Sequence, residues 1–152
     1  MIGLLQRVTQ AQVAVDGQVI GQIGPGLAVL VGIVRGDDTA AAQRLLQRIL
    51  NYRVFPDREG RMNLSLRDVA GGLLLVPQFT LAADTARGNR PGFSRAAEPP
   101  QAAALYNYVL EQARGLHSPV AAGRFGAQMQ VSLTNDGPVT FWLESAMQLP
   151  EA

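Results

Sequence analysis

Hydrophobic and polar residues alternate along the first part of the chain, as they do in half-buried β-strands. The run GLLQRVTQAQVAV (residues 3–15) is followed by Asp16-Gly17 and by a second alternating run, VIGQI. Asp-Gly between two such runs is a strong signal of a β-hairpin. The next stretch, GPGLAVLVGIV (residues 24–34), is almost continuously apolar. It predicts a central strand that is buried on both faces.

Two later segments change to helical spacing. The first starts at Asp37 or Asp38, either of which can cap a helix, and continues to about Tyr52. The second is expected to start behind Pro99-Pro100 and to run to about Arg114, with Gly115 as its stop. The apolar residues on their inner faces are Ala42, Leu45, Leu46, Ile49 and Leu50 in the first helix, and Ala102, Leu105, Val109 and Ala113 in the second.

The remaining apolar runs predict three more strands. GGLLLVPQFTL (residues 71–81) is one, and AQMQVSLT (residues 127–134) and VTFWLE (residues 139–144) are the others. NDGP joins the last two, and a simple hairpin turn is the favoured interpretation of that tetrapeptide. A sheet with two main helices and a mixed strand order indicates an α+β fold, or a sheet rolled towards a barrel. No linker or repeat divides the chain, so residues 1–152 are expected to form a single domain.

Composition excludes several kinds of chemistry. The chain has no Cys, and all 13 of its basic residues are Arg. Thiol nucleophiles, disulfides, thiolate metal sites, Schiff bases and a P-loop lysine are therefore excluded. The one histidine, His117, is expected to be a solvated loop residue. No metal site and no cofactor are predicted, and the net charge of +1 is too small to indicate DNA or RNA binding by itself.

The chain shows no signal for a membrane or for export. Its apolar runs are far too short to span a bilayer. Gln6 and Arg7 interrupt the segment in which a signal peptide would need continuous apolar residues, so a cytoplasmic protein is expected. The neighbouring acids Asp37-Asp38 and the pair Asp57/Glu59 are typical of caps and turns, which leaves little support for a two-carboxylate mechanism.

The stretch PQFTLAADTARGNRPGF (residues 77–93) is the main candidate for chemistry. It places Gln78 and Thr80 at the end of a buried strand, beside a long loop. Thr80 is a candidate nucleophile without a visible base, or it positions water while a backbone N–H stabilises an oxyanion. The alternative is that Gln78 and Thr80 are the polar face of an ordinary strand. In the following loop Arg87, Arg90 and Arg95 form either a patch that contacts phosphate or a merely solvated segment.

Taken together, four stretches resemble the bacterial D-aminoacyl-tRNA deacylases, the family also called D-tyrosyl-tRNA(Tyr) deacylases. They are QRVTQAQVAVDG, DREGRMNLSL, PQFTLAADTARGNRPGF and GRFGAQMQVSLTNDGPVTFWLE, and the resemblance covers practically the whole chain. It implies a homodimeric, cytoplasmic hydrolase that cleaves D-amino acids from tRNA, and also glycine. Such an enzyme performs chiral proofreading as part of translation quality control, binds tRNA as its RNA partner, and needs neither DNA nor a membrane.

The resemblance also implies roles for individual residues. In the family a cis Gly-Pro peptide, here Gly137-Pro138, reaches across the dimer as a chiral selector. It would lie opposite the catalytic residues Gln78, Phe79 and Thr80 of the other protomer. A rigid backbone unit of this kind rejects L-amino acids without reading any side chain. Three further residues match family positions, Arg7 as a brace of the Gly-Pro loop and Phe125 and Met129 near the pocket.

The chain departs from the family at one position of the candidate site. Members usually carry Ser immediately before the Gln, whereas here that residue is Pro77. Proline has neither a hydroxyl nor an N–H, so a serine nucleophile at this position is excluded. Two alternatives to the deacylase therefore stay open: a catalytically inactive tRNA-binding dimer of the same fold, and a hydrolase of small esters.

Overall fold

The computed structural model describes residues 1–145 of the chain. Its strands are β1 (Ile2–Val15), β2 (Gln18–Ile23), β3 (Gly26–Gly32), β4 (Phe55–Pro56), β5 (Met62–Leu64), β6 (Gly72–Pro77), β7 (Val120–Ala122) and β8 (Gln130–Glu144). Its helices are α1 (Thr39–Asn51), α2 (Leu66–Val69), α3 (Pro99–Leu116) and the 3₁₀ helix η1 (Phe79–Ala82).

The six main strands form one mixed sheet in the order β2-β1-β3-β6-β7, with β8 paired to β1. β1 is antiparallel to β2, β3 and β8, whereas β3-β6 and β6-β7 are parallel. The first half of β1 pairs with β3 and the second half with β2, while β8 follows β1 along nearly its whole length. At Gly21 of β2 an added Cβ would lie 2.8 Å from the carbonyl oxygen of Ala122 in β7. The sheet therefore rolls until β2 approaches β7, which confirms the α+β fold with a sheet rolled towards a barrel.

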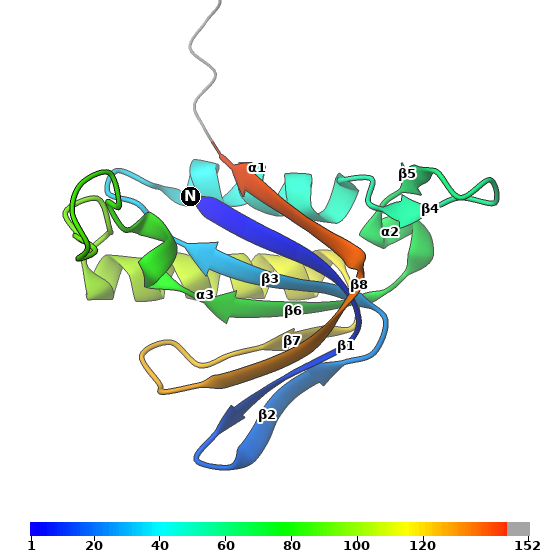
Figure 1. Ribbon diagram of the computed structural model, residues 1–152, viewed down its shortest axis with the longest axis horizontal. Helices are drawn as coiled ribbons and strands as arrows, with labels where there is room; N and C mark the ends of the chain where they lie inside the picture. The colour runs from blue at the N-terminus through cyan, green and yellow to red at the C-terminus, as the bar shows by residue number, and fades with distance from the viewer. Residues whose placement is uncertain (146–152) are drawn as a thin grey trace, which may run out of the picture.

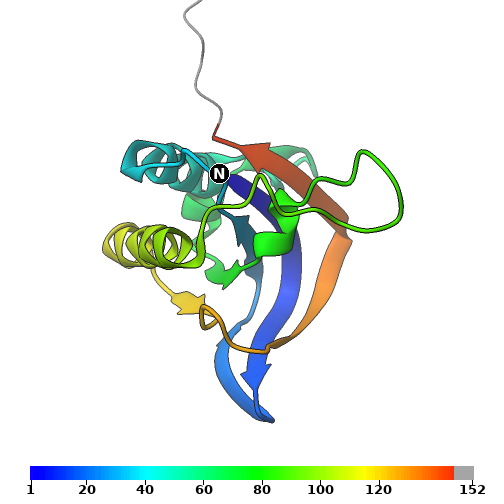
Figure 2. The same ribbon diagram turned by 90° about the vertical axis from the view of Figure 1, so that its left-hand side faces the viewer.

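Helices α1 and α3 lie side by side on one face of the sheet (Figure 2). The predicted inner face of each helix is buried, and Asp38 caps α1 by accepting a hydrogen bond from the N–H of Ala41. These apolar faces pack on β3 and β6, whose residues are almost all fully buried, and together they form the larger hydrophobic core. Burial of helix faces on a continuous apolar sheet is the main stabilisation of such a layer.

The first hairpin is confirmed in detail. β1 and β2 are joined by Asp16 and Gly17, which have φ angles of +50° and +76°. Two consecutive residues with positive φ are typical of a type I′ turn, the turn that matches the twist of the flanking strands. Asp and Gly tolerate this conformation better than other residues, which is why the dipeptide predicts the turn.

Helix α3 and the segments around it differ from the prediction. α3 continues through Gly115 to Leu116, so the predicted stop at Gly115 is wrong. His117 is not a solvated loop residue: it caps the helix, and its ring Nε2 lies 2.6 Å from the carbonyl oxygen of Gly71. The strand β7 and the short elements β5 and α2 have no counterpart in the prediction. Elements of two to four residues are too short for a hydrophobic period to be recognised.

The strand predicted for residues 71–81 ends early. β6 stops at Pro77, and the next residues form the turn of η1. Gln78 and Thr80 are therefore not the alternating polar face of a strand, and that alternative interpretation is wrong. Pro77 lies beyond the last pair of β6 with β7, Leu75 with Ala122, so its missing N–H breaks no bond of that ladder.

The predicted C-terminal hairpin is also wrong. Residues 130–144 form one strand, β8, that runs antiparallel to β1 from Ala14 back to Ile2. The register changes in the middle: Thr140 pairs with Gln6, and Asn135 pairs with Val8. Residues 136–139 therefore face the single residue Arg7, and the last three residues of NDGP lie in a large bulge of a continuous strand (Figure 1). We call residues 136–139 the β8 bulge.

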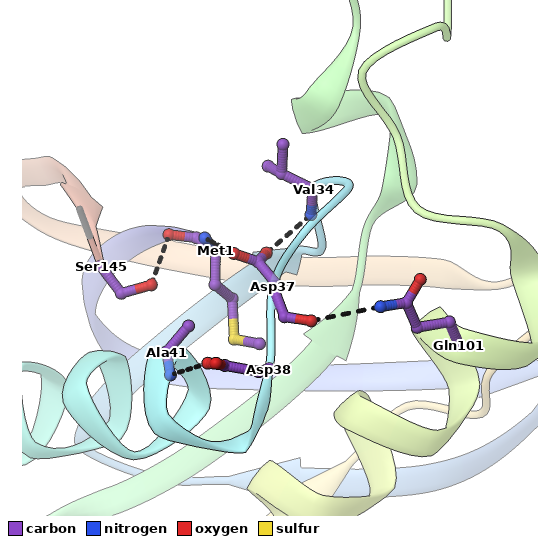
Figure 3. Close-up of polar contacts among 7 residues, drawn as sticks. All are labelled: Met1, Val34, Asp37, Asp38, Ala41, Gln101 and Ser145. Atoms are coloured by element: carbon purple, nitrogen blue, oxygen red, sulfur yellow. Dashed lines mark hydrogen bonds and ion pairs between the residues drawn. The ribbon is translucent and has the colours of Figure 1, made fainter. Parts of the chain in front are cut away.

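The start of the chain is fixed inside the fold, as Figure 3 shows. The α-ammonium group of Met1 lies 2.8 Å from Oδ1 of Asp37, and the N–H of Val34 donates to Oδ2 of the same carboxylate at 2.7 Å. The N–H of Ser145 donates to the carbonyl oxygen of Met1, which joins β8 to the same cluster. Within residues 1–145 no helix is long and apolar enough to cross a membrane.

Candidate functional site

The end of β6 and the loop after β7 form the first part of the candidate site. We call Pro77, Gln78, Phe79 and Thr80, together with the neighbouring Gly123, Phe125 and Met129, the β6 corner. Gly123 fits because it has no side chain: an added Cβ would lie 2.8 Å from Sδ of Met129 and 3.3 Å from Cδ of Pro77. Phe125 packs near Tyr106, with ring centroids 6.4 Å apart. The fold thus brings Phe125 and Met129 to the β6 corner that holds Gln78, Phe79 and Thr80.

Gln78 is held on both sides. Its backbone N–H donates to the carbonyl oxygen of Val31 at 2.8 Å, which continues the β3-β6 ladder one residue past β6. Its side-chain amide donates a hydrogen bond to the hydroxyl of Thr80. No carboxylate or imidazole is bonded to Thr80 among the described residues. A hydroxyl without a neighbouring base is a poor nucleophile, so the geometry favours a positioning role for Thr80.

Phe79 and Thr80 are the exposed residues of the β6 corner, and Phe79 is a large apolar one. Its side chain is 58% exposed, although its ring lies against Phe93 of the long loop with centroids 5.1 Å apart. Phe93 is itself 40% exposed, so the two rings form a small apolar patch beside the strand end, which is the kind of surface that binds a ligand or a partner. The same loop carries Arg87, Arg90 and Arg95, which are all exposed.

Beneath the β6 corner lies a buried tyrosine that supports the backbone. The hydroxyl of Tyr106 lies 2.9 Å from the carbonyl oxygen of Leu75 and 3.1 Å from that of Gly123. Burial raises the pKa of Tyr106 well above its ordinary value, so the phenol stays neutral at physiological pH. Tyr106 therefore ties α3 to β6 and to the Gly123 loop, and it does not act as an acid or a base. Sequence reasoning missed this residue, since a tyrosine on an apolar helix face has no distinguishing pattern.

The β8 bulge forms the second part of the candidate site. Gly137 and Pro138 at its tip are exposed, and the peptide bond between them is cis. The side chain of Asn135 closes the base of the bulge: its Oδ1 accepts from the N–H of Val139 at 2.9 Å, and its Nδ2 donates to Oγ1 of Thr140 at 2.8 Å. Both ends of the bulge are thereby tied together behind an exposed backbone tip.

Arg7 holds the bulge from the side of β1. Its Nε donates to the carbonyl oxygen of Asp136 at 3.1 Å, and one terminal nitrogen donates to the carbonyl oxygen of Val54 at 2.7 Å. Gly137 has a φ of +131°, and an added Cβ would lie 2.7 Å from Cγ2 of Val139 and 3.2 Å from the Arg7 guanidinium. Only glycine fits this conformation and this space without strain. Arg7 and Gly137 therefore fix the position of the tip.

The β6 corner and the β8 bulge are separate in one chain. The arrowhead of β6 and the bend of β8 lie at different ends of the sheet in Figure 1, and no hydrogen bond joins the two groups within the described residues. The structure thus brings together two sets of the predicted site residues, one around Gln78 and one around Gly137, and keeps the sets apart. Residues 1–145 also contain no group of three or more acidic or histidine side chains that could hold a metal ion.

Comparison with known proteins identifies the family. The family profile described as D-Tyr-tRNA(Tyr) deacylase matches residues 4–144. The chain belongs to the D-aminoacyl-tRNA deacylase family. A D-aminoacyl-tRNA deacylase of Nitrosococcus oceani is 65% identical over 144 residues, which are 95% of this chain and 93% of the relative. Another, from Thioalkalivibrio sulfidiphilus, is 62% identical, over 95% of this chain and 97% of the relative. The predicted family and enzyme class, a hydrolase, are confirmed.

Two solved structures share the fold of the deacylase chain. One, titled c-Myc DNA Unwinding Element Binding Protein, superposes with a TM-score of 0.92 at 43% identity and covers 96% of this chain and 99% of that chain. The other, titled as a probable eukaryotic D-amino acid tRNA deacylase, has a TM-score of 0.82 at 19% identity, with coverages of 94% and 98%. At that low identity the second structure supports the fold alone.

Proposed function

We propose that the protein hydrolyses the ester bond between a D-amino acid, or glycine, and the terminal ribose of tRNA. The proposal rests on the match of the family profile to residues 4–144, together with the two exposed half-sites of the chain, the β6 corner and the β8 bulge. The active unit is a homodimer in which the β8 bulge of one protomer reaches the β6 corner of its partner. A single chain keeps the two half-sites apart, so a second copy is needed to complete the site.

Selection for the D-configuration is assigned to the backbone of the β8 bulge. D- and L-aminoacyl esters differ only in the arrangement of substituents around one carbon. An enzyme that accepts many D side chains must bind the α-amino group, which all of them share, and exclude the position of an L side chain. The exposed carbonyl groups of Gly137 and Pro138 would accept from the α-ammonium, and the fixed tip would clash with an L side chain. Glycine has no side chain to exclude and is therefore accepted.

The chemical step is assigned to the β6 corner. Backbone N–H groups at Phe79 and Thr80 would stabilise the negative charge that develops on the carbonyl oxygen of the ester. Thr80, oriented by the Gln78 amide, would position the water that attacks the carbonyl carbon. The bond to the ribose oxygen then breaks, and that oxygen leaves with the proton released by the water. The substrate 2′-hydroxyl is available to assist, which accounts for a mechanism without a protein base.

Substrate RNA is expected to meet the long loop beside the β6 corner. Arg87, Arg90 and Arg95 are exposed there, and arginine suits phosphate through its fork of donors. Phe93 of the same loop packs against Phe79, so the loop that carries these arginines is attached to the β6 corner, which supports a role in holding tRNA next to the reacting ester.

Hydrolysis of D-Tyr-tRNA, Gly-tRNA and L-Tyr-tRNA by the purified protein, with a chelator present, tests the proposal. We expect rapid release of D-Tyr and glycine and little release of L-Tyr. Binding of tRNA without release from any substrate would indicate the inactive tRNA-binding dimer. Cleavage of small esters in preference to charged tRNA would indicate the other alternative.

A matched pair of glycine variants tests the selector. Gly137→Ala places a Cβ against Val139 and Arg7 at a φ of +131°, so the tip must move. Gly60→Ala imposes a similar backbone strain at a φ of +81°, in an exposed loop where a Cβ meets nothing within 4 Å. We expect Gly137→Ala to lower the D-to-L ratio of kcat/KM by at least about tenfold, while Gly60→Ala keeps the ratio. Full discrimination in Gly137→Ala would contradict the selector role.

A further inference from the structure

The outer face of α1 is basic and amidic. Helix α1 (Thr39–Asn51) contains no acidic residue, and its exposed face carries Gln43, Arg44, Gln47, Arg48 and Asn51. Arg67 of α2 extends this surface, since its guanidinium donates to Oδ1 of Asn51 at 3.3 Å. A surface of several arginines and neutral amides without a carboxylate of its own attracts an anion. The proposed chemistry makes no use of it.

A shallow hollow of about 350 Å³ lies at the C-terminal end of this face. It is lined by Gln47, Arg48, Asn51 and Tyr52. The Arg48 guanidinium lies over the Tyr52 ring, 5.7 Å from its centroid, and donates one hydrogen bond to the carbonyl oxygen of Glu144 at 2.9 Å. The other donors of the fork stay available to a ligand.

Two carboxylates of neighbouring segments accept hydrogen bonds from other groups. The carboxylate of Glu144 accepts from Nε1 of Trp142 at 2.8 Å, and that of Asp68 accepts from the N–H of Ser65 at 2.8 Å. Neither carboxylate is paired with Arg44 or Arg48, because the ion pairs found among the described residues involve other arginines. Among the described residues the hollow therefore keeps a guanidinium without an ion pair, an aromatic ring and the amide of Gln47.

The hollow is connected to the β8 bulge through two separate contacts. The first contact is made by Arg7, which binds Asp136 in the bulge and Val54, two residues after Tyr52. The second is made by the Tyr52 ring, which packs edge-on against Phe141 of β8 with ring centroids 5.6 Å apart. Figure 1 shows α1 beside the C-terminal half of β8. A chain that starts at the selector tip can therefore continue onto this end of α1.

We propose that this hollow binds a phosphate and its nucleoside from the unpaired acceptor end of tRNA, upstream of the nucleoside that carries the amino acid. This inference rests on the proposed function and adds a second RNA contact, on the protomer that supplies the bulge. The phosphate lies against Arg48 and Arg44, and the base stacks on the Arg48 guanidinium, which lies over the Tyr52 ring. The amide of Gln47 binds the edge of the base, while the Asn51 amide is bonded to Gln47 and Arg67 and holds this surface in place.

The physical reason is the chemistry of single-stranded RNA. Unpaired nucleotides are bound by arginine at the phosphate and by aromatic rings or guanidinium planes at the base, and amide side chains supply hydrogen bonds to base edges. The hollow combines these groups in one place. A small apolar molecule would find only one ring there, and an acidic peptide has no flat base to stack on the guanidinium plane.

Two arginine variants and one matched control test the inference. Arg48→Gln removes the guanidinium in the hollow, and Arg44→Gln removes the next one along the helix face, whose side chain forms no hydrogen bond or ion pair within residues 1–145. Arg114→Gln is the control, because Arg48 and Arg114 are each the basic residue in the last turn of an exposed helix. Each variant is assayed on D-Tyr-tRNA and on D-tyrosyl-adenosine, the substrate without any upstream nucleotide.

We expect Arg48→Gln to raise KM for D-Tyr-tRNA about tenfold at unchanged kcat, and Arg44→Gln to raise it several-fold. The slope of log KM against log salt should fall by about one for each phosphate that the variant no longer neutralises. Hydrolysis of D-tyrosyl-adenosine should stay within about twofold of the parent protein in all variants, since this substrate cannot reach the hollow.

Other outcomes would overturn the inference. Unchanged KM and salt slope in both variants would show that tRNA does not contact this face. Equal losses on D-Tyr-tRNA and D-tyrosyl-adenosine would show an effect on the reacting site instead. Failure of the parent protein to hydrolyse either substrate would refute the proposed function itself, which is a different result from a selective loss on tRNA.

Discussion

The ion pair between the start of the chain and Asp37 makes a strong prediction about stability. The side chain of Met1 is fully buried, and the side chain of Asp37 is only 12% exposed. Asp37→Asn keeps the shape of the side chain and one oxygen for the N–H of Val34, but it removes the charge that faces the α-ammonium group. Leaving one partner of a buried pair without its counter-charge costs about 3–5 kcal/mol. In a domain of this size that corresponds to a fall in Tm of roughly 6–20 °C.

Thermal and urea unfolding at neutral pH measure this loss. Asp38→Asn is the matched control, because asparagine caps a helix about as well as aspartate, and Asp38 serves α1 as its cap. We expect the control to stay within about 0.5 kcal/mol of the parent protein. If the free energy of unfolding of Asp37→Asn were within about 1 kcal/mol of that of the parent protein, the reasoning would be refuted, since the buried charge would then have found another partner.

A second measurement separates the ion pair from other effects of Asp37. The chain has no Lys, so its α-amino group is its only amine, and acetylation under denaturing conditions followed by refolding modifies that group selectively. The acetylated parent protein should lose a similar free energy. Acetylation and Asp37→Asn together should cost clearly less than the sum of the two, because both remove the same interaction.

Two further predictions concern the β6 corner. Pro77→Ser should change kcat/KM for D-Tyr-tRNA by less than about threefold, since the ladder of β6 does not use an N–H at this position and no step is assigned to a side chain there; a larger gain would mean that the serine takes part. Tyr106→Phe removes the hydroxyl that binds Leu75 and Gly123 and should cost about 1–2 kcal/mol. Because burial raises the pKa of Tyr106, its stabilisation is fully present below pH 10.0, the pKa of an ordinary tyrosine, and is lost as the pH rises further. Urea midpoints at neutral and alkaline pH should therefore fall more steeply with pH in the parent protein than in Tyr106→Phe.

Sequence patterns predicted the parts of the fold that local interactions determine. Asp16-Gly17 sets a turn by its own backbone preferences, and the period of α1 follows from burial of one face. The apolar run in β3 is buried because its side chains enter a hydrophobic core on each face of the sheet, Leu27 and Val29 in one and Ala28 in the other. In each case the sequence of one segment determines its local structure, so the prediction does not require knowing which other segment packs against it.

The prediction of a C-terminal hairpin was wrong for a physical reason. NDGP has the composition of a turn, but β1 is long enough to pair with residues on both sides of it, and the pairing continues past the interruption. A turn and a bulge have similar local chemistry, and the partner strand decides between them. The end of β6 shows the same limit of local sequence. Pro77 indicates that a strand can end there, but the change to η1 depends on the hydrogen bond of Gln78 to Val31 of β3.

The construction of the β8 bulge explains how a site can be selective and still tolerant. At the tip, Gly137 and Pro138 present backbone groups to solvent, and the side chains that hold them, Arg7 and Asn135, bind from behind. In the proposed mechanism this backbone tip offers the same groups to every substrate, so it would read the arrangement around the α-carbon and ignore the identity of the side chain. Rigidity would then be the source of selectivity, because a tip that moved aside would admit L-amino acids as well. In the proposed dimer the reacting groups belong to the partner, so selection and chemistry lie on separate protomers and meet only in the assembled site.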